Sequence, residues 1–596
     1  MTFSQNTTQT LRKLEGIRQL VNVNKKKSVS IKLLNENNKP ITDNKEMANT
    51  FNNFYSNLGN SIEQKIPNSQ QSFLSYLDTQ TNNIFHAIPC DESEIATIIS
   101  NFGLKKASGP NSIPNNLLKE FSSLLTYPIK ILVNKSLSEG TFPTLLKTAQ
   151  VCPIYKKLDK TKCVNYRPIS LLSNLSKIFE RIMYNRLERY LERNNMIYNH
   201  QFGFRRSYST EHALMSITEQ IKSNFRTKSY SCGVFVDLEK AFDTVNHSIL
   251  ISKLRHYGLN EICLSWFTSY LNNRSQQVSL NGQTSDSRPV TCGVPQGSIL
   301  GPLLFLIYIN DMNTAIKNST VCHFADDTNL LYSQKNPKVL KKIMNKDLKT
   351  LYEWLCANRL SLNVGKTEFI IFRPPRKSLT DRIVLTLNKT KIYESSRIKY
   401  LGLILDPRLT WKEHINELPK KLGRSVGMLY KTRHFCPTPI LKSLYYSIFN
   451  SHVSYGIPVW GYADQIYIKK IICAQKKAIR AITFSKYREH STPLLKRLEI
   501  LKIQDLLYLR TASLLWDLNK GNLPSSLSSY FTRANSIHEQ NTRFAKSGNL
   551  KVCKDFNSFQ SIAIKIFNDL NNKQSFSASN KKAFLDKIKL DFISNY

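Results

Sequence analysis

The sequence lacks an apolar stretch long enough to cross a membrane. Its longest apolar run, SILGPLLFLIYI at residues 298–309, stops at Asn310-Asp311. A membrane-spanning helix needs about 20 apolar residues, so this run is too short. The polar N-terminus, MTFSQNTTQTLRKLEG, also lacks the apolar core of a signal peptide. We therefore expect no membrane partner.

Cysteines are scattered and odd in number. There are 11 of them, and no two form a CxxC pair. This pattern argues against a disulfide framework and against a zinc ribbon. It favours reduced thiols, and we expect an intracellular location, in the nucleus, in a cytoplasmic ribonucleoprotein, or in both.

Acidic side chains are scarce relative to basic ones. The 43 Asp and Glu stand against 84 Lys and Arg, which gives a formal net charge of +41. A polyanionic partner explains this excess best, and nucleic acid is the commonest polyanion. A Lys-rich solvated surface and a membrane surface are the alternatives, and the second would need an anchor. An apolar content of 41% excludes a wholly disordered chain.

The 596 residues suggest about three or four domains. Residues 1–85 are polar and predict a loosely packed connector with short helices, one of them over 45–58. Residues 86–405 alternate apolar segments with Gly/Pro turns and include a strand-like run over 368–372. This alternation predicts an α+β class, with a sheet covered by helices on one side.

The pattern changes after residue 405 to amphipathic helices with basic polar faces. We divide this part into helical regions over 406–500 and 501–596. A basic helical region beside a mixed sheet suits binding of a nucleic-acid duplex, although a bundle without a ligand would look similar. The expected helices span 414–435, 439–450, 463–483 and 503–518.

Two segments carry candidate chemistry, and the first is SCGVFVDLEKAFD at residues 231–243. A fully apolar strand over 232–236 ends abruptly at Asp237. A carboxylate at the end of a buried strand is exposed only where the strand opens into a site. Taken alone, an ordinary strand-end Asp that caps the next helix is the simpler interpretation.

The second segment, TVCHFADDTNLLY at residues 320–332, predicts a β-hairpin with Asp326 and Asp327 at its tip. A structural turn would favour Asn-Gly or Asp-Gly, and a divalent cation would relieve the repulsion between the aspartates. With Asp237 they would form the oxygen-rich site that Mg²⁺ prefers. Two such ions about 3.5–4 Å apart support nucleotidyl transfer. Metal hydrolases usually add His ligands, and the position of His323 is weak evidence either way.

At these residues the sequence resembles the reverse transcriptases of non-LTR, LINE-type retrotransposons of the jockey group. The resemblance covers most of the chain in consistent order. The motifs that carry it are LKKASGPNSIPNNLLK (104–119), CPIYKK (152–157), NYRPISLLS (165–173), QFGFRRSYST (201–210), FVDLEKAFDTV (235–245), GVPQGSILGPLLF (293–305), FADD (324–327), SLNVGKTEFIIF (361–372), YLGLILDPRLTW (400–411), SHVSYGIPVWG (451–461) and AQKKAIRAI (474–482).

The resemblance implies a right-hand polymerase fold of fingers, palm and thumb with a basic helical C-terminal region. It assigns the catalytic triad to Asp237, Asp326 and Asp327, with the first two as the firmer ligands of two Mg²⁺ ions, or of Mn²⁺. It adds the backbone carbonyl of Leu238 to one metal site. The neighbouring Glu239 departs from the small or hydroxyl residue usual in the family.

The same resemblance implies the contacts to an incoming nucleotide. Lys156 and Arg167 would neutralise the triphosphate, and Lys366 would protonate the leaving pyrophosphate. Phe242 would be the steric gate that excludes a 2′-hydroxyl, with a core aromatic as the alternative. Gln296 and Gly297, in the GVPQG loop, would lie under the template and the incoming base.

Template and primer contacts follow in the same way. Arg205 is expected either to contact the template or to pack within the fingers. The primer-grip hairpin is assigned to Tyr400, Leu401 and Gly402. The resemblance also suggests that Lys240 and Asp243 form a supporting ion pair.

An endonuclease usually precedes this type of polymerase, and we expect it to be missing by truncation or supplied in trans. The sequence therefore predicts an RNA-directed DNA polymerase that uses an RNA template, a DNA primer at its target and dNTPs. The alternative is a catalytically inactive, retroelement-derived RNA-binding protein.

Overall fold

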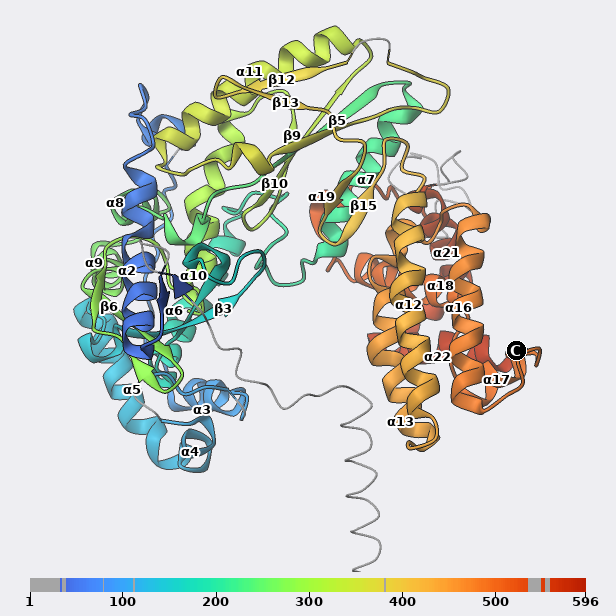
Figure 1. Ribbon diagram of the computed structural model, residues 1–596, viewed down its shortest axis with the longest axis horizontal. Helices are drawn as coiled ribbons and strands as arrows, with labels where there is room; N and C mark the ends of the chain where they lie inside the picture. The colour runs from blue at the N-terminus through green and yellow to red at the C-terminus, as the bar shows by residue number, and fades with distance from the viewer. Residues whose placement is uncertain are drawn as a thin grey trace, which may run out of the picture.

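The structure is a computed structural model that describes residues 33–34, 39–78, 80–104, 106–110, 113–379, 382–533, 548–551 and 558–596. Its elements form three regions, a central sheet between a mixed region and a helical one (Figure 1). We name them palm, fingers and thumb.

The palm is a four-stranded sheet of order β11-β5-β10-β9 in which all neighbours are antiparallel. Both faces of the sheet are buried. Val234 on β5 belongs to a core shared with the fingers, whereas Leu331 and Ile370 belong to a core shared with the thumb. The mixed composition fits the α+β class, but the expectation of helices on one side is wrong, because α7 covers one face and α11 the other. These elements are β5 (Tyr230–Val236), β9 (Thr320–Phe324), β10 (Asp327–Gln334), β11 (Glu368–Phe372), α7 (Thr210–Arg226) and α11 (Pro337–Ala357).

The fingers contain a second sheet, in which β3 pairs in parallel with β6 and antiparallel with β4. Helices pack around it and continue toward the palm (Figure 1). The elements are β3 (Thr148–Tyr155), β4 (Tyr166–Leu171), β6 (Arg274–Leu280), β7 (Gln283–Thr284), β8 (Arg288–Val290), α3 (Glu92–Ser100), α4 (Asn115–Glu120), α5 (Ser122–Glu139), α6 (Asn174–Arg193), α8 (His247–His256), α9 (Glu261–Leu271) and α10 (Leu300–Ile309).

Helix α2 (Asn44–Glu63) confirms the helix predicted within the connector. The loose packing expected of it is wrong. Phe51 is fully buried against the fingers sheet, and the buried Asn52 amide donates to Ser285 Oγ at 3.0 Å and to the Asp286 carbonyl at 2.7 Å. The helix is therefore an integral part of the fingers.

The hairpin of β14 (Ile398–Tyr400) and β15 (Leu403–Leu405) connects the palm to the thumb. The four helices predicted after residue 405 are present, and the second turns from α-helical to π-helical at Tyr445. The C-terminal helices share one hydrophobic core with α12 and α16. The division of the chain at residues 85, 405 and 500 stays a prediction. The helices are α12 (Lys412–Thr432), α13 (Thr438–Leu444), α14 (Ser451–Ser454), α15 (Ile457–Trp460), α16 (Gln465–Thr483), α17 (Ser491–Leu498), α18 (Ile503–Asn519), α19 (Ser525–Ser528), α21 (Phe559–Asn572) and α22 (Lys581–Ser594).

Within the described ranges, no helix combines the length and the apolar character needed to cross a membrane.

Candidate active site

Three carboxylates lie at the same end of the palm sheet, where two neighbouring strands end. Asp237 follows β5 directly, and β10 pairs with β5 in the register Thr328 to Val236. Extending this register by one residue sets Asp327 opposite Asp237. Asp326 lies in the tight turn between β9 and β10, where Ala325 takes a left-handed φ of 58°. The predicted hairpin and strand end are confirmed, and the three side chains share one end of the sheet.

Burial and mutual repulsion disfavour negative charge on the hairpin pair. Burial, then Asp326 and Asp237, raise the pKa of Asp327 to about 6. Burial also raises the pKa of Asp326, while Arg167 and Lys156 lower it. Negative charge on these carboxylates is therefore unfavourable in this environment, and a bound cation would stabilise it.

Asp237 has a cationic neighbour. Lys366 Nζ lies 3.4 Å from Asp237 Oδ2, and both side chains are partly exposed. Such a pair contributes little to stability, so its significance is that it brings an ammonium group to the carboxylates. The proton-donor role of Lys366 stays a prediction.

The Leu238 carbonyl is left free by the local strand pairing. Leu238 bridges to Leu362, and the flanking bonds run from Asn363 N to Asp237 O and from Glu239 N to Ser361 O. In this antiparallel pattern, the paired residue directs its own N–H and C=O away from its partner. Leu238 can therefore offer its carbonyl on the opposite side, as the resemblance implies.

The predicted triphosphate cations are on the fingers, beside the carboxylates. Lys156 directly follows β3 and Arg167 lies on β4, and both are exposed. Burial lowers the pKa of Lys156, and the nearby charges of Arg167 and Lys366 lower it further. This concentration of like charge suits an anion of several negative charges. Contact with a nucleotide stays a prediction.

Phe242 is half-buried and packs on the palm core. Its ring stacks on Phe305 of α10 with the centroids 4.5 Å apart, and Phe204 lies against it at 6.2 Å. The ring is therefore fixed in position, as a steric gate requires, but the same packing would suit a core aromatic. Its role stays a prediction.

The GVPQG loop connects the palm to the fingers. Ser170 N donates to Gln296 O at 2.8 Å, and a Cβ on Gly297, whose φ is 136°, would lie 2.3 Å from Ser170 O. A Cβ on Gly293, whose φ is 81°, would likewise lie 2.7 Å from the Asp243 carbonyl oxygen. Glycine is needed at these two positions because the backbones approach so closely.

In the described part of the chain, Asp243 does not form the predicted ion pair with Lys240, although the charge of Lys240 lowers its pKa. Among the described residues, its carboxylate is bonded by the Gln296 amide, with Nε2 2.9 Å from each oxygen, and no ion pair joins it to Lys240. Burial raises the pKa of Asp243 to about 6. The Gln296 side chain is thus turned inward, so its predicted contact with sugar or base would require it to leave Asp243.

Glu239 faces outward, where it accepts a hydrogen bond from Ser361 Oγ at 3.2 Å.

The predicted primer-grip hairpin is held between palm and thumb. Tyr400 is buried and packs on Phe235 of β5 with the centroids 5.0 Å apart. Leu401 and Gly402 form the turn with φ values of 42° and 85°. Tyr455 Oη, in the thumb, donates to the Leu401 carbonyl at 2.6 Å. Tyr455 is a support that the sequence did not single out, although it lies within the SYG part of a thumb motif.

Arg205 is committed to contacts within the fingers. Its guanidinium forms two bonds of 2.7 Å to Glu192 and lies over the Tyr208 ring, and its side chain is 7% exposed. This placement fits packing within the fingers rather than template contact.

His323 is also structural, since its Nδ1 bonds with Thr328 Oγ1 and burial lowers its pKa to about 3.

Sequence reasoning missed the role of the QFG part of QFGFRR. Phe202 N donates to the His323 carbonyl at 2.8 Å, and Ala325 N donates to Gln201 Oε1 at 3.2 Å. A Cβ on Gly203 would lie 2.4 Å from Ala325 N. These contacts support the hairpin that carries the acidic pair. The sequence signal for this role is Gly203 between two phenylalanines, which was identified only as part of the family motif.

The donor set fits hard cations in its chemistry. It contains carboxylate and carbonyl oxygens, and burial, together with repulsion between the carboxylates, raises the pKa of Asp326 and Asp327. Within the described part of the chain, however, no three His, Cys, Asp or Glu side chains already converge as a metal cluster. Binding would therefore require the aspartate side chains to turn toward the ion.

Residues 155–405 match the family described as reverse transcriptase (RNA-dependent DNA polymerase). This stretch contains the three carboxylates and the two finger cations. It is therefore a reverse transcriptase domain, and the predicted family is confirmed.

Three curated relatives come from Drosophila melanogaster mobile elements. The chain is 30% identical over 478 residues to the "Probable RNA-directed DNA polymerase from transposon BS", covering 77% of this chain and 52% of the relative. It is 28% identical over 425 residues to the "RNA-directed DNA polymerase from mobile element jockey", covering 70% and 46%. The X-element relative matches at 28% over 431 residues, again covering 70% and 46%. The chain thus spans about half the length of the curated relatives it matches.

Proposed function

We propose that this chain is the RNA-directed DNA polymerase of a non-LTR retrotransposon, extending a DNA primer 3′-OH on an RNA template. The observation that carries the proposal is the position of three carboxylates at one end of the palm sheet, beside two finger cations. Charge of both signs at one place suits a substrate that is a phosphate ester bound with metal.

In this proposal each residue group has a separate task. Two Mg²⁺ ions, held by Asp237, Asp326, Asp327 and the Leu238 carbonyl, would supply the charge that activates the 3′-hydroxyl and stabilises the leaving pyrophosphate. Lys156 and Arg167 bind and orient the triphosphate on the fingers side.

The remaining assignments concern proton supply and selection. Lys366, already beside a carboxylate, donates a proton to the leaving group. Phe242, fixed on Phe305, excludes the 2′-hydroxyl of a ribonucleotide. Replacing Phe242 by Val should raise ribonucleotide incorporation, and unchanged sugar discrimination would contradict the gate.

Primer extension on an RNA template with dNTPs tests the central claim. The Asp237→Ala/Asp326→Ala variant should lose extension, because both proposed metal-holding carboxylates are removed. Glu239→Ala is the matched control: it removes a nearby carboxylate that faces outward, and it should keep extension. Full activity in the double variant would refute the site assignment.

The alternative is an inactive, retroelement-derived RNA-binding protein. RNA binding without extension by the unmodified chain, at any Mg²⁺ or Mn²⁺ concentration, would favour it.

A further inference from the structure

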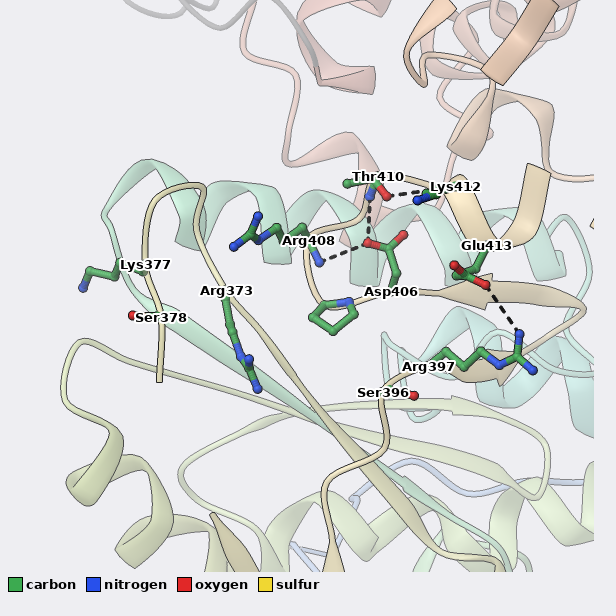
Figure 2. Close-up of a pocket in the computed structure, with 11 residues that line it drawn as sticks. Arg373, Lys377, Ser378, Ser396, Arg397, Asp406, Arg408, Thr410, Lys412 and Glu413 are labelled. Atoms are coloured by element: carbon green, nitrogen blue, oxygen red, sulfur yellow. Dashed lines mark hydrogen bonds and ion pairs between the residues drawn. The ribbon is translucent and has the colours of Figure 1, made fainter. Parts of the chain in front are cut away.

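A second group of cations surrounds an open cavity of about 770 Å³ at the base of the thumb. Three segments line it: the end of β11, the approach to β14, and the loop that leads into α12. Figure 2 shows their side chains around the cavity. The lining residues that matter here are Arg373, Lys377, Arg397, Arg408, Thr410 and Lys412.

This cavity is well separated from the three carboxylates. Strand β11 runs antiparallel to β5, with Glu368 opposite Phe235 and Phe372 opposite Ser231. Arg373, at the end of β11, therefore lies near the start of β5, whereas Asp237 follows its end. Six residues of strand separate Ser231 from Asp237, and six residues span roughly 20 Å. The cavity is not part of the nucleotide site.

The acidic side chains of the cavity are already engaged. The Asp406 carboxylate accepts the backbone N–H groups of Arg408, Thr410 and Trp411 at 3.1, 3.0 and 2.8 Å. Glu413 lies 3.5 Å from Arg397. Neither carboxylate is free to neutralise the other cations of the cavity.

Several donors in the cavity have no protein acceptor. The side chains of Arg408 and Lys412 are exposed, and neither forms a hydrogen bond or an ion pair within the residues that the structure describes. Arg373 pairs through Nη2 with Glu394, and its buried Nε has no partner among the described residues. Lys377 Nζ donates to the Lys228 carbonyl at 2.8 Å, and Arg397 also lies 4.0 Å from Glu417. Within the described residues, Arg408 and Lys412 are therefore the two lining cations whose side chains have no partner, and they attract anions.

We propose that this cavity binds phosphate groups of a nucleic-acid backbone outside the polymerase active site. Arginine presents a planar fork to phosphate oxygens, and Thr410 adds a hydroxyl. The cations come from three segments around an open cavity rather than converging on one point, which suits a passing strand better than a single small anion. This inference depends on the proposed function in one respect: a polymerase binds nucleic acid, so nucleic acid is taken as the polyanion.

The test compares two variants that each remove two positive charges. Arg408→Gln/Lys412→Gln alters the cavity, and Lys341→Gln/Lys342→Gln is the control, since both of these lysines are exposed on α11. Anisotropy of labelled RNA, measured as a function of salt, gives the affinity and the salt slope. Each lost phosphate contact should lower the slope by roughly 0.7 and weaken binding about fourfold at about 0.15 M salt, hence about 14-fold for two contacts.

We expect the cavity variant to show this loss and the control to resemble the unmodified chain, with circular dichroism confirming that all three are folded. The difference should shrink as the RNA is shortened until it cannot reach both sites. Equal slopes for the two variants on long RNA would overturn the proposal. So would inorganic phosphate binding that the cavity variant loses while RNA binding is unchanged, because the site would then serve free phosphate. The binding result holds whether or not the chain extends primers, so it fails separately from the proposed function.

Discussion

A methyl group on Gly59 tests whether α2 is built into the polymerase. In α2 this glycine faces the segment after β5 and the GVPQG loop. An added Cβ would lie 2.1 Å from Cys292 Sγ and 2.6 Å from the Asp243 carbonyl oxygen. The second of these atoms is backbone and cannot rotate away. Gly59→Ala must therefore push α2 away from the loop that carries Gln296.

The magnitude follows from two opposing effects. Overpacking of this kind costs about 1–3 kcal/mol. Alanine in place of glycine inside a helix contributes about 1 kcal/mol of stability in return. Gly59→Ala should therefore range from neutral to a loss of about 2 kcal/mol. Gly423→Ala, in α12, is the matched control, because its added Cβ meets nothing within 4 Å and should gain about 1 kcal/mol.

Denaturant unfolding of the two variants in parallel gives the comparison, and primer extension gives its functional consequence. We expect Gly59→Ala to be the less stable variant by about 1–3 kcal/mol and to lose extension activity that Gly423→Ala retains. Equal stabilisation of both variants would refute the docking of α2 against the loop.

Three further predictions concern charge. Burial and the nearby Asp326 raise the pKa of Asp327 from 3.8 to about 6. The native state therefore binds this proton more tightly than the unfolded chain does, and the protein loses stability as the pH rises from about 4 to 6. Asp327→Asn should be more stable than the unmodified chain above pH 6 in thermal unfolding, and no gain would contradict the shift. Lys366→Gln should lower kcat for primer extension by about 10²-fold, because general acid catalysis contributes about 10²- to 10⁴-fold; an unchanged kcat would exclude a proton-donor role. Lys253 is fully buried and paired with Asp311, so Lys253→Met should lower the free energy of unfolding by about 3–5 kcal/mol in denaturant unfolding. A smaller loss in the Lys253→Met/Asp311→Leu variant would confirm the pairing, and an equal or larger loss would contradict it.

The strands that carry the site could be predicted because their signals are local. The run over 368–372 is β11, residue for residue, and the apolar run before Asp237 is the last part of β5. Buried strands are short, continuous apolar runs bounded by turns, so their limits are readable without knowledge of the fold. The acidic pair at the hairpin tip was predictable for the same reason.

Polar partners were not predictable, because they are chosen in three dimensions. Gln296 is separated from Asp243 by 53 residues, and the nearer Lys240 was the natural guess. Arg205 looked available to a template, but Glu192 on α6 satisfies its guanidinium. Sequence patterns give the side that an apolar residue faces, whereas a polar residue can satisfy its hydrogen bonds with many alternatives. The motif therefore identified these residues but not their contacts.

The charge balance at the palm supports the proposed chemistry more strongly than any one residue does. Burial and like-charged neighbours raise the pKa of Asp326 and Asp327 and lower the pKa of Lys156. Each set of charges is thus crowded, and in the part of the chain that the structure describes only Lys366 and Asp237 form an ion pair across them, at 3.4 Å. A purely structural cluster would interleave opposite charges and relax both shifts. A metal-bound triphosphate would satisfy both sets at once, with cation against the carboxylates and phosphate against the fingers. This arrangement of charges is therefore what the proposed binding of a metal-bound triphosphate requires.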